Sequence, residues 1–251
     1  MRSFFVLLDR ELKSYFYSPL AYIILTFFLI LTGYLLGTTV EFFQGQPRQY
    51  LPFEFFFNNL LFWIAFLLTI PIITMRLYSE EFKLGTIEPL MTAPVRDWQV
   101  VAAKFFGALL FFLILWAPTA TYFGIFQSIT GQAATGSAGA FAGSYLILLL
   151  MGMFYISIGC LASVLTQNQI IAAIVSLVTI LLFFFIGIVA TVKPNVSQNL
   201  RDLMAYTTSV LHMQDYSRGV LDTRPVVFYT SMTALLQFIT YQVFQYRKWQ
   251  F

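Results

Sequence analysis

Charged residues are scarce in this sequence. They make up 10% of its 251 residues, against about 25% in soluble domains, whereas 59% of the residues are hydrophobic. Four long stretches contain no Asp, Glu, Lys, Arg or His: residues 14–40, 55–75, 105–192 and 225–246. A membrane-spanning helix needs roughly 20 apolar residues. The deficit therefore excludes an ordinary soluble domain and predicts an all-α integral membrane protein.

Cysteine and histidine each occur once, as Cys160 and His212. One cysteine excludes a disulfide within the chain and argues against a thiolate metal site. The expected spans have no ionisable residue in their interiors, which disfavours a proton-coupled carrier or an intramembrane hydrolase, because such groups are usually kept for function. The sequence has no nucleotide-binding motif, so we expect no catalytic site, no metal site and no ATP hydrolysis by this chain itself. The net charge of +3 is too small and too dispersed to suggest nucleic acid.

The apolar stretches predict one transmembrane domain over residues 1–251. Between Lys104 and Lys193 there is room for three spans with short turns. The six expected spans lie near residues 20–40, 57–78, 100–126, 140–165, 168–192 and 225–246.

Basic residues near the span ends predict the orientation. With a cytoplasmic N-terminus, nine of the 14 Lys and Arg residues lie inside and five outside. Four of the outer five share one longer loop with three aspartates. An even number of spans then places both termini in the cytoplasm of a multi-pass cell (inner) membrane protein.

Residues 3–17 predict an amphipathic helix in the membrane interface, with Ser18 and Pro19 as the break before the first span. Aromatic and aliphatic side chains fill one arc, basic ones lie opposite, and Glu11 sits at the apolar edge. Such a helix suits an anionic lipid surface, although a solvated extension of the first span remains the alternative. The expected interface residues are Phe4, Phe5, Leu8, Arg10, Leu12 and Lys13.

Other features within the apolar sequence favour packing over chemistry. The Gly33-x-x-x-Gly37 spacing permits close helix approach, and Pro71 and Pro118 predict kinks inside the second and third spans. The small residues of 131–143 predict an outer loop. They lack the Gly-Lys-Ser/Thr ending that a phosphate-binding loop requires.

Residues 193–224 form the largest outer segment, in which apolar and polar residues alternate. We expect one or two short, half-buried helices there. His212 and Asp215 have the spacing of an acid–base pair, but a lone His beside one Asp is more often a hydrogen-bonded surface pair.

Residues 76–104, by contrast, are rich in charge. Glu80 and Glu81 are expected to end an extension of the second span, followed by Gly85 and Thr86 as a flexible point and a helix cap. Glu88 then opens a short helix with an apolar face. Such a helix can insert into a groove on a cytosolic protein, although composition alone favours a plain interfacial loop equally well.

The order of residues in this segment resembles the coupling segment of type-2 ABC transporter permeases, and the form SEEFKLGTIEPLMTAPV is most similar to permeases of the gliding-motility-associated branch. The resemblance covers the N-terminal helix, the six spans, a coupling segment over residues 79–97 with its cytosolic coupling helix, and the outer helical segment. The matching residues are Glu80, Glu81, Gly85, Thr86, Glu88, Leu90, Pro94 and, downstream, Lys104.

The resemblance implies a transmembrane subunit of an ATP-driven transporter that acts with cytosolic ABC ATPase subunits. We expect this transporter to be an exporter. ATP and Mg²⁺ would bind to those partners, and this chain would hold no cofactor. It would pair with a second permease chain, identical or related, and an auxiliary membrane or periplasmic protein is a further expected partner. Closure of the ATPase dimer would drive the coupling segments together and tilt the spans.

Two other functions stay open. An ATP-independent carrier would transport by itself and would need a polar site in mid-membrane. A membrane scaffold, or an anchor that transmits force in a motility or secretion machine, would bind the ATPase without moving a substrate.

Overall fold

The computed structural model describes residues 2–43, 51–87, 95–131, 134, 136–192 and 206–248, and every regular element within them is a helix. In chain order the helices are α1 (Arg2–Phe16), α2 (Pro19–Phe43), α3 (Pro52–Asn58), α4 (Leu60–Thr74), α5 (Ser79–Leu84), α7 (Asp97–Trp116), α8 (Thr119–Thr130), α9 (Ala138–Leu165), α10 (Gln169–Val192), α12 (Ser209–Ser217) and α13 (Thr223–Lys248).

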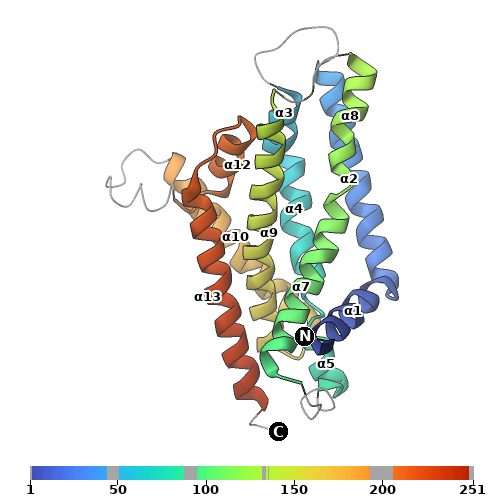
Figure 1. The fold of residues 1–251 in the computed structure, drawn as a ribbon, viewed down its shortest axis with the longest axis vertical. Coiled ribbons are helices and arrows are strands. Elements are labelled where there is room, and N and C mark those ends of the chain that lie inside the picture. The colour runs from blue at the N-terminus through green and yellow to red at the C-terminus, as the bar shows by residue number, and fades with distance from the viewer. Residues whose placement is uncertain are drawn as a thin grey trace.

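The long helices run side by side along one axis, and the short ones lie at its two ends (Figure 1). The α1–α5 end, at the bottom of Figure 1, holds α1, α5 and the last turns of α13, with α1 set at an angle to the bundle. The α3–α12 end, at the top, holds α3, α12 and the end of α8. The long helices therefore connect two ends that carry different short helices.

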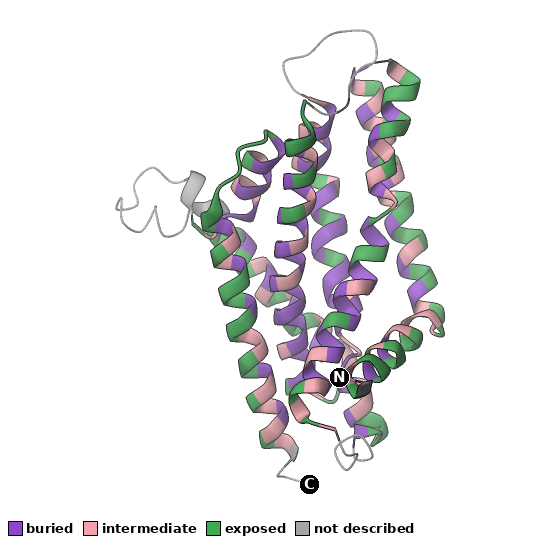
Figure 2. Cartoon of the chain, viewed as in Figure 1, coloured by how far each residue is buried: buried purple, intermediate pink, exposed green. Residues whose placement is uncertain are grey.

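Helix α9 forms the centre of the bundle. In its most apolar stretch 83% of the residues are buried, compared with 28% in those of α2 and α10. The burial pattern of Figure 2 agrees, with buried residues concentrated on the inner helices. Apolar side chains that stay exposed on α2 and α10 are those expected of a surface in contact with lipid.

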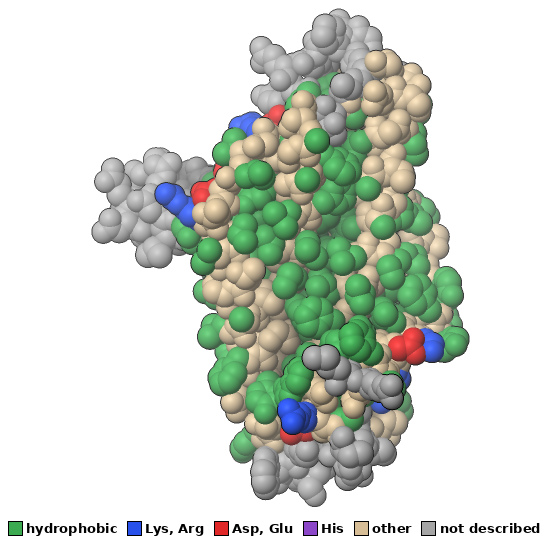
Figure 3. Space-filling model, in the orientation of Figure 1, with side chains coloured by type: hydrophobic (Ala, Val, Ile, Leu, Met, Phe, Trp, Pro, Cys, Tyr) green, Lys and Arg blue, Asp and Glu red, His purple; other side chains and the backbone are tan. Residues whose placement is uncertain are grey.

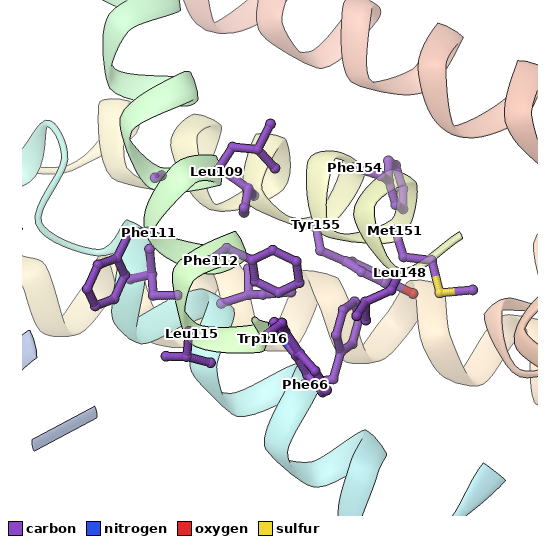
Figure 4. Close-up of a cluster of buried hydrophobic side chains, with 14 of the residues drawn as sticks. Phe66, Leu109, Phe111, Phe112, Leu115, Trp116, Leu148, Met151, Phe154 and Tyr155 are labelled. Carbon is purple, nitrogen blue, oxygen red and sulfur yellow. The ribbon is translucent and has the colours of Figure 1, made fainter. Parts of the chain in front are cut away.

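In the core, aromatic side chains of α4, α7 and α9 pack together with aliphatic ones (Figure 4). The Trp116 ring lies 5.2 Å from that of Phe62, and the Phe66 ring lies 5.7 Å from that of Tyr155. Close packing of α7 on α9 requires Gly152, because a Cβ there would lie 2.6 Å from the Phe112 ring. Each buried aromatic side chain contributes a large apolar area to this core.

Five helices are long and apolar enough to cross a membrane, as expected for the first five spans. They are Pro19–Phe43, Leu60–Leu84, Asp97–Thr130, Ala138–Leu165 and Gln169–Gly187. On the face seen in Figure 3, charged side chains lie near the two ends, and hydrophobic side chains cover the band between them. The expected sixth span corresponds to α13, which is 26 residues long but less apolar than the other long helices, so its role as a span stays a prediction.

Some sequence-based expectations need correction. The segment before the second span contains a short helix, α3, that the sequence did not predict, and the expected loop over 131–143 already becomes helical at Ala138. The Gly33 and Gly37 pair does not serve packing within the chain, because a Cβ at either position would meet no described atom within 4 Å. Pro118 does interrupt the third span, between α7 and α8.

Candidate coupling site

The second span does not stop at the end of α4. A turn over residues 75–78 leads into α5, which carries Glu80 and Glu81 beyond the end of the bundle core (Figure 1). Helix α5 ends at Gly85, whose φ of +70° lies in the left-handed region that glycine adopts without strain. We call residues 75–87 the coupling arm.

Lys104 of α7 is the centre of a buried ionic cluster that joins the arm to α1. Its ammonium lies 2.9 Å from Glu81 Oε2 and donates a hydrogen bond of 3.2 Å to Glu11 Oε1. The Arg10 guanidinium completes the cluster, at 2.9 Å from Glu11 Oε1 and 3.2 Å from Glu81 Oε1. We call these four residues the charged junction; it connects α1, the arm and the base of the third span.

The junction is balanced in charge, with two cations and two carboxylates. The Lys104 side chain is 1% exposed and that of Glu11 8% exposed, so neither has enough water to stabilise it alone. Burial alone would raise the pKa of the Glu11 carboxyl, but the Lys104 ammonium and the Arg10 guanidinium hold that pKa below its usual range. Glu11 is therefore ionised at neutral pH, as the pairing requires.

A second ion pair fixes the turn that precedes α5. Arg76 contacts both carboxylate oxygens of Glu80, with Nε 2.6 Å and Nη2 2.9 Å away. Its Nη1 donates a 2.6 Å hydrogen bond to Ser18 Oγ, at the break between α1 and α2. Because the Arg–carboxylate pair is bidentate, it holds the arm in a defined direction relative to that break.

Helix α9 holds the turn between α4 and α5 through hydrogen bonds of Ser163, which we call the Ser163 clasp. Ser163 Oγ accepts hydrogen bonds from the Tyr78 and Ser79 backbone N–H groups, at 3.1 and 3.2 Å, and donates to the Met75 carbonyl at 3.1 Å. These backbone groups lack partners in a helix ladder because the helix is interrupted there. One turn earlier on α9, Gly159 lets Thr74 approach so closely that a Cβ would lie 2.1 Å from Thr74 Oγ1.

A cavity of about 270 Å³ adjoins the junction between α1, α2, the second span and α7. Its polar lining includes Glu11, Glu81 and Lys104, together with Arg76 and Ser18. The arm is thus held by a few ion pairs and hydrogen bonds around an open space. The cavity gives the charged side chains that line it room to change partners if the arm moves.

The structure divides the expected coupling residues into three groups. Glu81 and Lys104 meet in the junction, whereas Glu80 pairs separately with Arg76. Gly85 ends α5, and Thr86 is exposed just before the buried Ile87. The remaining expected residues, Glu88, Leu90 and Pro94, lie outside the described residues, as does most of the expected coupling helix.

The expected interface residues belong to a helix that packs mainly on α7. The Phe4 ring packs edge-to-face against the Phe106 ring, and Phe5 is exposed. Leu8 and Leu12 are half-buried, and the exposed Lys13 pairs with Asp9 at 2.5 Å. Arg10 binds within the junction instead of pointing freely toward a lipid surface.

Sequence reasoning missed three residues of the site. Glu11 carried a usable signal, because a carboxylate at the apolar edge of an amphipathic helix needs a buried cationic partner. Ser163 and Gly159 carried none, since small residues are frequent in apolar helices and only the packed structure shows what they contact.

The expected surface pair of His212 and Asp215 at the opposite end does not form. His212 is buried, and its Nδ1 lies 3.1 Å from the Tyr229 hydroxyl. Burial lowers the pKa of His212 to about 4, so the ring is neutral at neutral pH. The Tyr229 and Tyr155 hydroxyls both contact Ser209 Oγ, at 3.2 and 2.8 Å. We call His212, Tyr229, Ser209 and Tyr155 the neutral network.

A comparison with protein families finds one match, to the family described as ABC-2 family transporter protein, over residues 40–214. This range covers more than half of the chain and runs from the end of α2 into α12, including the coupling arm and Lys104. No protein of curated function matches the sequence. Together with the apolar helices, the family match identifies a multi-pass membrane protein.

Proposed function

The chain belongs to the ABC-2 family of transporter proteins, and we propose that it is the permease subunit of an ATP-driven exporter. Membership of this family implies a membrane component that works with a partner ATPase. In the proposal, two permease chains pair in the inner membrane, α13 forms the sixth span, and both termini face the cytoplasm. ATP and Mg²⁺ bind to the ATPase subunits.

The charged junction is the observation that carries the proposal. It places Glu81 of the coupling arm within 2.9 Å of Lys104 at the base of the third span, and the same ammonium binds Glu11 of α1. A force applied to the arm therefore reaches two further elements through one buried cation. The Ser163 clasp supports the same role, because it gives the arm a fixed contact with the central helix α9.

The order of events follows from these contacts. Closure of the ATPase dimer moves the part of the arm that follows Gly85. This movement rotates α5 about the turn that Ser163 holds. Glu81 then shifts relative to Lys104, and α1 and α7 follow because an unpaired charge at this buried position is costly. The form of residues 79–95 also supports a place in the gliding-motility-associated branch, in which an auxiliary membrane or periplasmic protein joins the complex.

The proposal can be tested without knowledge of the substrate. The tagged chain is purified from its native membranes in mild detergent and analysed for a co-purifying ABC ATPase. In a Cys160→Ala background, single cysteines are introduced at two exposed positions, Leu84 on α5 and Val220 at the opposite end. Addition of Mg²⁺ and ATP is expected to change the labelling rate at both positions.

Glu81→Ala separates ATPase docking from coupling. We expect this variant to retain the ATPase and its ATP hydrolysis but to lose the ATP-dependent change at position 220. Lys83→Ala, on the same short helix but outside the junction, is the matched control and is expected to behave as wild type. A complex without an ABC ATPase, or a Glu81→Ala complex with a normal response at position 220, would contradict the proposal.

A further inference from the structure

A narrow apolar groove runs between α7 and α13 in the half of the bundle nearest α1. It encloses about 410 Å³, and Met153 of α9 contributes to its wall. The lining is almost entirely apolar and includes Val101, Phe105, Phe106 and Phe238. Phe106 and Phe238 are also partly exposed on the outer surface of the bundle, so the groove opens sideways and not into the core.

The groove continues into a wider and more polar mouth beside α1. Trp98, Ala102 and Phe106 line both spaces, which makes them continuous. The mouth encloses about 710 Å³ and adds Ser3, Arg96 and Gln99 to the lining. Apolar surface thus gives way to polar surface in the direction of the α1–α5 end.

The length of the groove matches one leaflet of a bilayer. Its lining runs from Trp98 to Phe106 on α7 and from Thr230 to Tyr241 on α13. At 1.5 Å per residue these segments rise about 12 and 16 Å, close to half of a hydrocarbon core of roughly 30 Å. The groove therefore has the length of one acyl chain in a single leaflet, and it opens sideways, in the direction of the surrounding lipid.

The mouth carries a cation, Arg96, that has no ion-pair partner within the part of the chain that the structure describes. Arg10, Lys13, Arg76 and Lys104 are all in ion pairs at this end of the bundle. The Arg96 guanidinium is exposed and forms no ion pair with any residue in the described ranges. Trp98 beside it is 51% exposed, as is typical of an aromatic side chain at the boundary between lipid and water.

We propose that this groove and its mouth bind one anionic phospholipid of the bilayer. An acyl chain lies between α7 and α13, and the phosphate binds Arg96, an arrangement that gives a charge-assisted contact at the membrane surface. Phe4 and Phe5 of α1 form the far side of the mouth. The lipid therefore contacts both α1 and α7, the two helices that the charged junction joins.

Native mass spectrometry of the full-length chain can test this proposal, with phosphatidylglycerol and phosphatidylcholine of identical acyl chains as the probes. We expect wild type to bind phosphatidylglycerol more tightly, and Arg96→Gln to lose that preference by about tenfold because one charge-assisted contact is removed. Lys83→Gln removes an exposed cation of α5 that lines neither space, and it should have no effect. Equal binding of the two lipids by wild type, or equal losses in the two variants, would overturn the proposal.

Variants of the groove wall test the acyl chain separately. Ala102→Trp should reduce binding of both lipids by filling the groove, and Ala234→Phe, at an exposed position of α13, serves the same purpose if the first variant does not fold. Thr233→Val is the matched control: the Thr233 hydroxyl is buried in the groove wall without a hydrogen-bond partner among the described residues. Unchanged lipid binding in Thr233→Val supports an acyl chain. Loss of binding there, or a change of oligomeric state in place of lipid binding in the filled variants, would overturn the proposal.

Discussion

At the α1–α5 end, four charged side chains from three segments meet in the charged junction, with Lys104 at its centre. The buried polar groups of the neutral network at the α3–α12 end carry no charge. Both ends fix short helices to the central helix α9. Ser163 of α9 binds the coupling arm at one end, and Tyr155 of α9 contacts Ser209 of α12 at the other. The same central helix thus holds both ends through hydroxyl groups, and the two ends differ in the charged junction that only the α1–α5 end adds.

The difference teaches how each end responds to change. The neutral network can lose one hydroxyl contact and keep its other hydrogen bonds, at a cost of about 1 kcal/mol. The charged junction has no such tolerance, because the removal of one partner leaves a buried charge without compensation. It also adjoins a cavity of about 270 Å³, so its partners have space in which to exchange. We infer that contacts at the α1–α5 end exchange during function, whereas the neutral network keeps its contacts while the helices around it move.

The largest effect is expected for Lys104→Met, which would break the charged end while leaving the neutral end intact. The substitution leaves Glu11 and Glu81 close together with only the half-exposed Arg10 to balance them. Loss of one partner from a buried pair costs about 3–5 kcal/mol. Thermal unfolding in detergent should show a correspondingly lower melting temperature.

Two further variants make the Lys104 result specific. Lys83→Met removes an exposed lysine from α5 and should change stability by about 0.5 kcal/mol at most. Addition of Glu11→Gln to Lys104→Met should recover part of the loss, because one of the two uncompensated carboxylates is then neutral. A double variant less stable than Lys104→Met alone would show that Lys104 acts by packing and not by charge.

Gly159→Ala tests the contact between the central helix and the last residue of α4, directly before the arm. A Cβ at position 159 would lie 2.1 Å from Thr74 Oγ1 and within 2.8 Å of the rest of that side chain, so α4 and α9 must separate. Overpacking of this kind costs about 1–3 kcal/mol, and we expect a value near the upper limit. Thr74→Gly in the same chain should restore part of the melting temperature. Gly33→Ala, where a Cβ meets no described atom within 4 Å, should cost nothing.

Acid should destabilise the two ends over different pH ranges, because their titratable groups take up protons at different pH values. His212 has a pKa lowered to about 4, so the folded state resists protonation that the unfolded chain accepts below pH 6.5. His212 therefore leaves the free energy of unfolding unchanged above pH 6.5 and lowers it as the pH falls toward 4. The loss is about 2 kcal/mol at pH 5. The lowered pKa of Glu11 keeps the charged junction ionised over this range.

Thermal unfolding of wild type and His212→Gln at pH 7.5 and pH 5.0 checks this prediction. Wild type should lose stability between the two values, and the variant should lose clearly less. A variant with the full wild-type pH dependence would place the titrating group elsewhere.

The sequence was sufficient to predict the helical class and the presence of five helices long and apolar enough to cross a membrane, because long uncharged stretches leave few alternatives. The break at Ser18 and Pro19 was also predictable from local chemistry, and α2 begins at Pro19. Helix α3 was missed because a proline and a short aromatic run are equally typical of a loop. Residues 225–246 are helical, but they are less apolar than the other long helices, so their role as a sixth span stays a prediction.

The candidate site was only partly predictable, for a physical reason. Motif order led to Glu81 and Lys104, which are far apart in the sequence but lie 2.9 Å apart in the structure. Glu11, the second carboxylate that pairs with Lys104, lies on a helix that the sequence assigned to the membrane surface. The contacts of Ser163 with the arm and of Gly159 with Thr74 depend on how α9 packs against the second span, and no local pattern encodes that packing.

The smallest effect on stability is expected at Gly85, where the arm turns at the end of α5. Its φ of +70° is unfavourable for other residues, but a Cβ would meet no described atom within 4 Å. Gly85→Ala should therefore cost only the backbone term of about 1–2 kcal/mol, and Gly85→Asn less, because asparagine tolerates this conformation. Melting temperatures and hydrogen exchange of residues 80–87 should rank wild type, Asn and Ala in that order. If all three exchange alike, the turn at Gly85 is not a fixed part of the arm, and the proposed rotation of α5 would have to begin closer to Ser163.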